Sequence, residues 1–373
     1  MSAQRILRED AIEVGSRPGA TIRPVRIGEP LWDAGGSPVA RTLQRVPDAD
    51  AGIDAVLAWC VDVGRAAPAP GLGDTASVWE ILASVAAHDL GIARMLEPHL
   101  DALTIIEQAG IVDPAVLGAG PTSTWGVFAA EGPGVRVTAR YAGGDWRLDG
   151  VKPWCSLAGT LTNALVTAHT DDGSRRLFAV DLGHAGVTAA DGPWVSRGLA
   201  QVVSAPVTFS AVPAVPVGED GWYLRRPGFA WGGIGVAACW WGGTVGLART
   251  LFSAAAGGSK APDQIALAHL GAVDLAVESG RIALREAGRH VDGIAADSPP
   301  PGVIARRTRS IVAANAESAL LHVAHALGPL PLVADESHAR RVADLQVYLR
   351  QHHAERDEAA LGSALLETGE LPW

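Results

Sequence analysis

The stretch LDGVKPWCSLAG at residues 148–159 combines a turn signal, a strand pattern, an aromatic side chain and a small hydroxyl. We predict that one strand ends here, that Asp149–Gly150 forms a tight turn, and that a second strand leads to Trp154 and Ser156. Residues two apart on a strand point to the same side, so Trp154 would offer a flat apolar wall and Ser156 a hydrogen-bond donor. A planar ring with polar edges needs this pairing. On these residues alone, a buried tryptophan beside a satisfied hydroxyl is an equal alternative.

The sequence around this stretch changes pattern twice. Residues 1–50 are irregular and punctuated by prolines, and apolar residues then recur at helical spacing from Asp54 to Gly110. Short runs separated by turn signals such as Gly143–Gly144 fill residues 118–217, and a helical pattern returns after them. We predict three units: an N-terminal irregular segment and α-helical domain over 1–118, a middle β domain over 119–220, and a C-terminal helical region over 221–373.

Local signals refine the helical parts. Asp89 is placed to cap a helix, and the apolar, glycine-rich run Phe229–Val245 is expected to be a buried helix because a membrane span needs ~20 strongly apolar residues. Breaks in the C-terminal helical pattern are expected at Gly257–Gly258, Ser298–Gly302 and Gly328–Pro331.

Composition narrows the class of protein. A hydrophobic content of 48% with 19% charged residues indicates a globular chain, and the dispersed formal charge of −10 argues against nucleic acid as a partner. The three cysteines are far apart, which speaks against a disulfide framework and a zinc site and fits a reducing cytoplasm. The N-terminus has no apolar core of signal-peptide length.

The order of helical, β and helical blocks, together with the turn at Trp154–Ser156, resembles the acyl-CoA dehydrogenase superfamily. The resemblance runs from about residue 54 to the C-terminus. It implies an α+β multidomain fold with an N-terminal α-helical domain, a middle β-barrel and a C-terminal four-helix bundle. It also implies FAD as cofactor, with Trp154 packed on the flavin and Ser156 hydrogen-bonded to it.

Other parts of the implied FAD site lack residues that the family has. The segment from Gly126 to Gly134, with Phe128, Ala130 and Glu131, lies where the family has its Thr-Glu-Pro flavin strand, and Ala130 replaces the threonine. Taken alone, this segment also reads as a strand end followed by a loop. The family's glutamine and Gly-Gly-x-Gly turn match His325 and Gly328, of which only Gly328 is retained.

The implied catalytic base is the main departure from the family. The dehydrogenases remove an α-proton with a carboxylate while the flavin takes a hydride. Arg350 stands at one carboxylate position, and a guanidinium is no general base at neutral pH. The other position falls in the run Gly235–Ala238, which holds only apolar residues and glycine.

Histidines offer a second chemistry, because related flavin monooxygenases use histidines near the ring. His99, His352 and His353 fall near such positions and are the candidate catalytic residues. The alternatives are a helix-end or surface histidine for His99 and an exposed polar face for the pair.

Three functions follow from the resemblance. The first is an FAD-dependent oxidoreductase acting on an acyl-CoA thioester or a similar small carbonyl compound. The second is a flavin-dependent monooxygenase that uses the histidines, and the third is a non-catalytic subunit beside a catalytic paralogue. The expected assembly is a homodimer, a homotetramer or a hetero-oligomer with a paralogue, in the cytoplasm, with neither a bound metal nor a membrane span.

Overall fold

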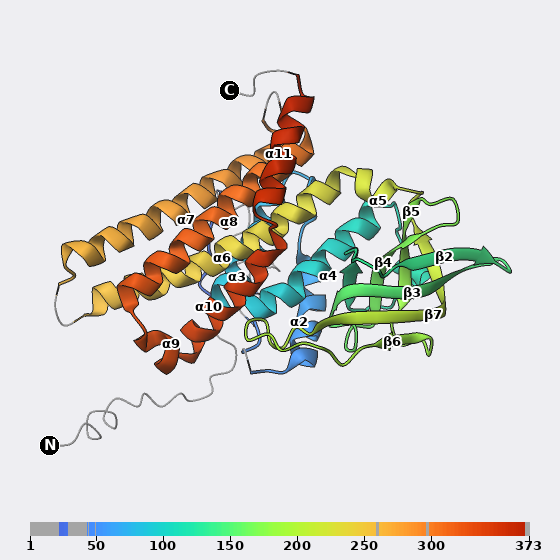
Figure 1. The fold of residues 1–373 in the computed structure, drawn as a ribbon, viewed down its shortest axis with the longest axis horizontal. Coiled ribbons are helices and arrows are strands. Elements are labelled where there is room, and N and C mark those ends of the chain that lie inside the picture. Colours follow the sequence, from blue (N-terminus) through green and yellow to red (C-terminus); the bar gives the residue numbers. More distant parts are fainter. Residues whose placement is uncertain are drawn as a thin grey trace.

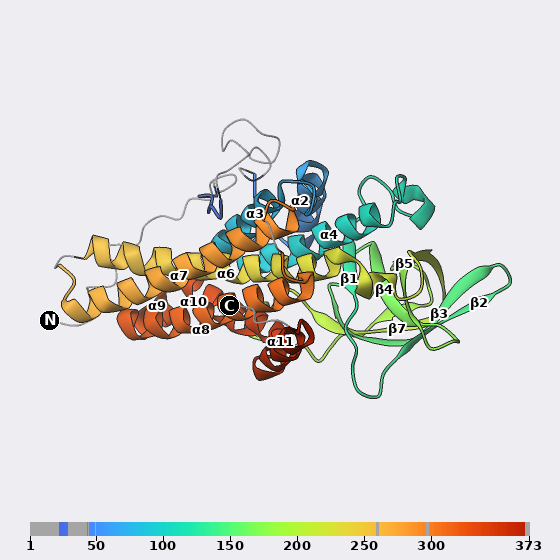
Figure 2. The same ribbon diagram turned by 90° about the horizontal axis from the view of Figure 1, so that it is seen from above.

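The computed structural model describes residues 22–28, 43, 45–48, 50–258, 261–295 and 298–369. Most of the irregular residues 1–50 therefore lie outside the described part. Long helices occupy one end of the molecule and the strands the other (Figure 1). The same division is clear from above (Figure 2).

The first helices pack around the middle of the molecule. They are α2 (Ile53–Ala66), α3 (Thr75–His88) and α4 (Leu90–Gln108), followed by the short 3-10 helix η2 (Pro114–Leu117). The predicted cap is confirmed, because the Asp89 side chain accepts a hydrogen bond from the Ile92 N–H at 2.9 Å. The described segment 22–28 lies against α3, where Val25 N–H donates to Ser84 Oγ at 3.0 Å.

The strands close into a small barrel. Its strands are β1 (Trp125–Phe128), β2 (Val137–Ala142), β3 (Asp145–Ser156), β4 (Asn163–His169), β5 (Arg175–Asp181), β6 (Val187–Ala189) and β7 (Ser204–Val217). Pairing runs from β4 through β2, β3, β7 and β5 back to β4, while β1 and β6 add to β4 and β7. Closure removes most of the free strand edges.

The predicted turn at Asp149–Gly150 is wrong. β3 is one continuous strand, and the reversal occurs earlier, at the Gly143–Gly144 loop between β2 and β3, where both residues have positive φ. Gly150 instead marks a β-bulge against β7. Its φ is 120°, and a Cβ there would lie 2.0 Å from the Arg136 carbonyl oxygen, so only glycine fits.

A second irregularity in β3 lies at the predicted cofactor wall. The register with β7 shifts between Lys152 and Cys155, and Trp154 has a φ of 58°. Trp154 is 65% exposed, whereas Ser156 is buried. Both residues lie on β3, but the regular alternation assumed for Trp154 and Ser156 is interrupted by this irregularity.

The C-terminal region is a helical bundle. It contains α5 (Trp222–Arg225), α6 (Pro227–Gly257), α7 (Gln264–Val291), α8 (Pro301–Leu327), α9 (Leu330–Ala334), α10 (Glu336–Tyr348), the 3-10 helix η3 (Leu349–Gln351) and α11 (Glu355–Glu367). The helix ends confirm the predicted breaks. α6 packs on α3, α4, α7, α8 and α10. In the part of the chain that is described, no helix combines the length and apolar character needed to cross a membrane.

The fold changes from helix to strand between Leu117 and Trp125, and back between Val217 and Trp222. These changes lie beside the predicted boundaries at 118/119 and 220/221. The division into three domains stays a prediction.

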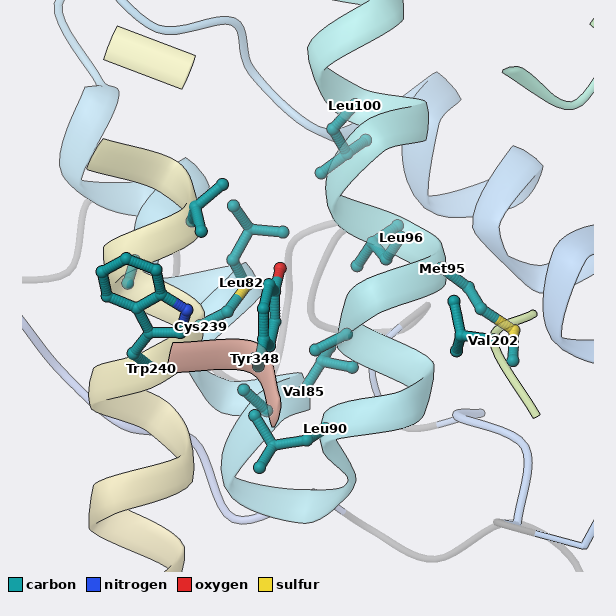
Figure 3. Packing of buried hydrophobic residues seen from close by; sticks show 14 of the residues in the cluster. Leu82, Val85, Leu90, Met95, Leu96, Leu100, Val202, Cys239, Trp240 and Tyr348 are labelled. Carbon is teal, nitrogen blue, oxygen red and sulfur yellow. The ribbon is translucent and has the colours of Figure 1, made fainter. Parts of the chain in front are cut away.

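The main core lies where α3, α4, α6 and α10 meet. Figure 3 shows the Tyr348 ring between the helix carrying Cys239 and Trp240 and the helix carrying Leu96 and Leu100. Tyr348 and Trp240 meet edge-on with ring centroids 6.3 Å apart. This core fixes α4, and with α4 the polar side chains described below.

Close approach of α3 and α6 depends on Gly242. A Cβ at this position would lie 2.2 Å from the Ala83 carbonyl oxygen, so the two helices would have to separate. We expect Gly242→Ala to lower the free energy of unfolding by about 1–3 kcal/mol. Gly271→Ala is the matched control, because it also lies in a long helix but has open space around it. It should stabilise the protein by up to about 1 kcal/mol. Urea unfolding measures both, and equal effects of the two variants would contradict this account.

Candidate functional site

A cavity of about 460 Å³ lies between α4, α6, α8 and the segment from η3 to α11. We call it the junction cavity. Its lining includes Glu97 and Asp101 from α4, Arg306 and Arg309 from α8, and His353 and Asp357 beyond η3. Its size falls in the range of small-molecule sites.

Glu97 is the buried acid of this cavity. Its side chain is only 10% exposed. Burial raises the pKa of Glu97 to about 7, and the charge of Arg94 opposes this shift only in part. A carboxyl group with a pKa near neutrality can both accept and donate a proton under ordinary conditions.

Arg94, one helical turn before Glu97, connects the cavity acid to the end of β3. Its Nη2 donates to Ser156 Oγ at 3.0 Å, and its Nη1 lies 3.6 Å from Glu97 Oε2. The guanidinium carbon also lies 5.7 Å from the centroid of the Tyr348 ring. The side chain is 14% exposed, and its Nη1 is buried with no hydrogen-bond acceptor among the described residues.

Ser156 belongs to the same network. Its Oγ lies 2.7 Å from Ser204 Oγ on β7, and Ser204 Oγ lies within 3.1 Å of the Val202 carbonyl oxygen. When Ser204 donates to that carbonyl, Ser156 donates to Ser204 and accepts from Arg94. The network links Ser156 to Glu97 through one guanidinium.

Two observations fit a planar heteroaromatic cofactor beside β3. The Trp154 indole is exposed, and among the described residues no aromatic ring packs against it. The buried Arg94 Nη1 is a charged donor still without an acceptor close to Ser156. An exposed wall and a nearby unsatisfied donor suit a ring with polar edges. The hydroxyl of Ser156 is engaged by protein partners, so Arg94 is the better placed donor.

Glu131 lies at the centre of a cluster of basic side chains. Its carboxylate lies 2.8 Å from Lys152 Nζ and 3.4 Å from both His169 Nε2 and Arg175 Nη2. Burial raises the pKa of Glu131, but the hydrogen bond and charge of Lys152 and the charge of Arg175 outweigh it, so the pKa falls below its usual range. The carboxylate is therefore already paired with Lys152 and Arg175, and the predicted part of Glu131 in flavin binding stays a prediction.

Phe128 and Ala130 precede Glu131 and differ in burial. Phe128 is buried in the main core, whereas Ala130 is exposed beyond the end of β1. Their predicted part in flavin binding stays a prediction.

His99 is enclosed by α2, α4 and β1. It is 3% exposed, and its Nδ1 accepts a hydrogen bond from Trp125 N–H at 3.3 Å. A Cβ on Gly64 would lie 2.8 Å from its Nε2. Burial lowers the pKa of His99 to about 4, so the ring is neutral at pH 7. The structure does not place His99 in the lining of the junction cavity.

Of the other two predicted histidines, His353 lines the cavity, and its Nδ1 lies 3.4 Å from Asp357 Oδ1. His352 is buried and does not line the cavity. Its Nε2 lies 3.1 Å from Ser310 Oγ and 3.8 Å from Asp357 Oδ2. Burial lowers the pKa of His352, and the Asp357 charge opposes that shift.

His325 and Gly328 are not brought together with Trp154 within one chain. His325 packs near His269 at the far end of α7 and α8, with ring centroids 5.8 Å apart, and Gly328 ends α8. Figure 1 places α9 and that end of α8 opposite the strands. The predicted part of His325 and Gly328 in cofactor binding stays a prediction.

Sequence reasoning missed Arg94, Glu97 and Asp101. Their spacing of three and four residues puts them on one face of a helix that is otherwise apolar, and charges on such a face are a recognisable signal. Arg350, at the expected base position, pairs with Glu317 at the surface.

The raised pKa of Glu97 predicts a pH dependence of stability. Below about pH 4.5 the carboxyl is protonated in both the folded and the unfolded state. Between about pH 4.5 and about pH 7 the unfolded state is ionised while the folded state keeps its proton, so the free energy of unfolding falls over this range and levels off above it. Glu97→Gln has no proton to lose, so relative to wild type it should gain on the order of 3 kcal/mol between about pH 5 and pH 8.

Thermal unfolding measures this difference, with Glu107→Gln as the control for losing an exposed carboxylate from the same helix. A constant difference between wild type and Glu97→Gln across this range would contradict the burial of an ionisable Glu97.

Comparison with solved structures shows the same fold at low sequence identity. Butyryl-CoA dehydrogenase from Megasphaera elsdenii aligns with a TM-score of 0.71 and 18% identity over 86% of this chain and 91% of that chain. KijD3 in complex with FMN and dTDP-3-amino-2,3,6-trideoxy-4-keto-3-methyl-D-glucose aligns with a TM-score of 0.69 and 19% identity over 80% of both chains. FMN-bound TdsC from Paenibacillus sp. A11-2 gives 0.67 and 17% over 79% and 84%.

No protein-family model and no curated protein matches the sequence. The structural likeness confirms the predicted α+β architecture of helical, β-barrel and helical-bundle parts. The chain has the fold of the acyl-CoA dehydrogenase-type flavoproteins.

Proposed function

We propose that this protein is a flavin-dependent oxidoreductase that binds a small substrate in the junction cavity. The observation that carries the proposal is the link from Ser156 through Arg94 to Glu97, because it joins the candidate flavin wall to a buried acid in a cavity of substrate size. Perturbed carboxyl groups in clefts are typical of functional sites.

A bound flavin would supply hydride or oxygen chemistry to this cavity. Trp154 would pack against the ring, and Arg94 would donate a hydrogen bond to its polar edge. Glu97 in its ionised form would take a proton from the substrate and return it later. It would thereby provide the carboxylate that Arg350 and the run Gly235–Ala238 lack.

FAD is the proposed cofactor, with an acyl-CoA thioester or a similar small carbonyl compound as substrate. FMN is the alternative cofactor, since KijD3 and TdsC were solved with it. With FAD as the cofactor, His325 and Gly328 would contact it only across an interface between copies of the chain, which is consistent with an oligomer.

A flavin-dependent monooxygenase is the second candidate. It is favoured by His353, which lines the cavity and lies 3.4 Å from Asp357. A histidine oriented by a carboxylate can form a hydrogen bond with an oxygenated substrate. Bleaching of a bound flavin by butyryl-CoA would favour the dehydrogenase, and oxygen uptake with added reduced flavin would favour the monooxygenase.

The flavin proposal is tested by absorption. The purified protein is incubated with excess FAD or FMN, unbound flavin is removed, and the visible spectrum is recorded. We expect a retained flavin, and we expect Trp154→Ala to weaken its binding about tenfold or more by removing the ring contact. Tyr141→Ala is the control, because Tyr141 is also an exposed aromatic residue of the barrel.

Failure of the wild-type protein to retain either flavin would overturn the proposal. A non-catalytic subunit would then be the better supported function. Equal losses of flavin binding in the Trp154 and Tyr141 variants would show that Trp154 is not part of the flavin site. They would leave the proposal of flavin binding itself in place.

A further inference from the structure

One wall of the junction cavity carries two guanidinium groups from successive turns of α8. Arg306 and Arg309 both line the cavity, and their spacing of three residues puts them on one helix face. Arg306 Nη1 donates to the Gly302 carbonyl oxygen at 3.2 Å. Neither arginine forms an ion pair with any of the described residues.

Arg309 is held in place by groups that carry no charge. Its Nη1 donates to the Gly233 carbonyl oxygen at 2.7 Å and its Nη2 to the Gln351 carbonyl oxygen at 2.9 Å. Its guanidinium carbon lies 4.7 Å from the centroid of the Trp240 ring. Two of its five N–H donors are used by the carbonyls, so the orientation is fixed while donors remain.

The acidic side chains of the cavity each lie close to a basic side chain. Arg226 lies 3.7 Å from Asp101 and also donates to Gln108, Glu97 faces Arg94, and Asp357 faces His353. Of the arginines that line the cavity, Arg306 and Arg309 on the α8 wall form no ion pair with a described residue, whereas Arg226 does. Burial lowers the pKa of Arg309, and the charges of Asp357 and Glu97 oppose this shift only in part.

We propose that the substrate of the junction cavity carries an anionic group, a carboxylate or a phosphate, which Arg306 and Arg309 bind. This inference rests on the proposed function, in which the cavity is the substrate site. Arginine forks match the oxygens of both groups, and pairing would offset the cost of two half-buried charges. A substrate with only an aliphatic chain would leave that cost in place.

Binding of matched probes tests the proposal. Isothermal titration calorimetry on the full-length protein would compare benzoate and phenyl phosphate with benzamide, a neutral compound of similar shape. At least one anion should bind about tenfold or more tightly than benzamide, and the tighter of the two anions identifies the group. The preference should disappear in Arg306→Gln and persist in Arg307→Gln, whose arginine is exposed on the same helix.

Arg309 also supports the backbone, so Arg309→Gln is paired with Arg309→Lys, which keeps the charge and should retain part of the preference. Circular dichroism confirms that each variant is folded. Equal binding of benzamide, no binding of any probe, or an unchanged preference in folded Arg306→Gln would overturn the proposal. Flavin retention, measured on the same samples, separates failure of the oxidoreductase assignment from failure of the anion site.

Discussion

The largely enclosed guanidinium of Arg94 is the constraint on which the site depends. It touches Ser156 at the end of β3, Glu97 one turn along α4, and the face of Tyr348 at the end of α10. A charge in this position is costly unless each neighbour compensates it. The helical N-terminal part, the barrel and the C-terminal bundle therefore meet at one cation, and the junction cavity opens beside it.

The charge balance around Arg94 also explains how the cavity could work. Glu97 gives Arg94 a partner only when ionised, yet burial holds its pKa near 7, so the acid is poised between two states. Further along the cavity, Asp101 pairs with Arg226 and Asp357 lies beside His353, whereas Arg306 and Arg309 form no ion pair with a described residue. A proton-transfer group and an unpaired positive wall share one space of substrate size.

Local signals predicted the fold well. Asp89 as a cap, Gly143–Gly144 as a turn and the breaks near Gly257 and Gly328 depend on a few neighbouring residues, and all appear in the structure. The turn predicted at Asp149–Gly150 was wrong because a glycine with positive φ occurs in a β-bulge as readily as in a turn.

The site was harder to predict, because its pairs join residues distant in sequence. Arg94 meets Ser156 across 62 positions, and no local pattern marks that contact. The reverse also occurred: His99 was singled out by its place in the sequence, but tertiary packing encloses it against Trp125.

The central claim, that Arg94 couples the acid of the cavity to the flavin wall, is tested most directly by titrating the visible spectrum of the bound flavin with pH. The account predicts a spectral transition with a midpoint near pH 7 in the wild-type protein, because ionisation of Glu97 changes the charge beside Arg94. That transition should be absent in Glu97→Gln. The same transition in both proteins, or none in the wild type, would contradict the coupling.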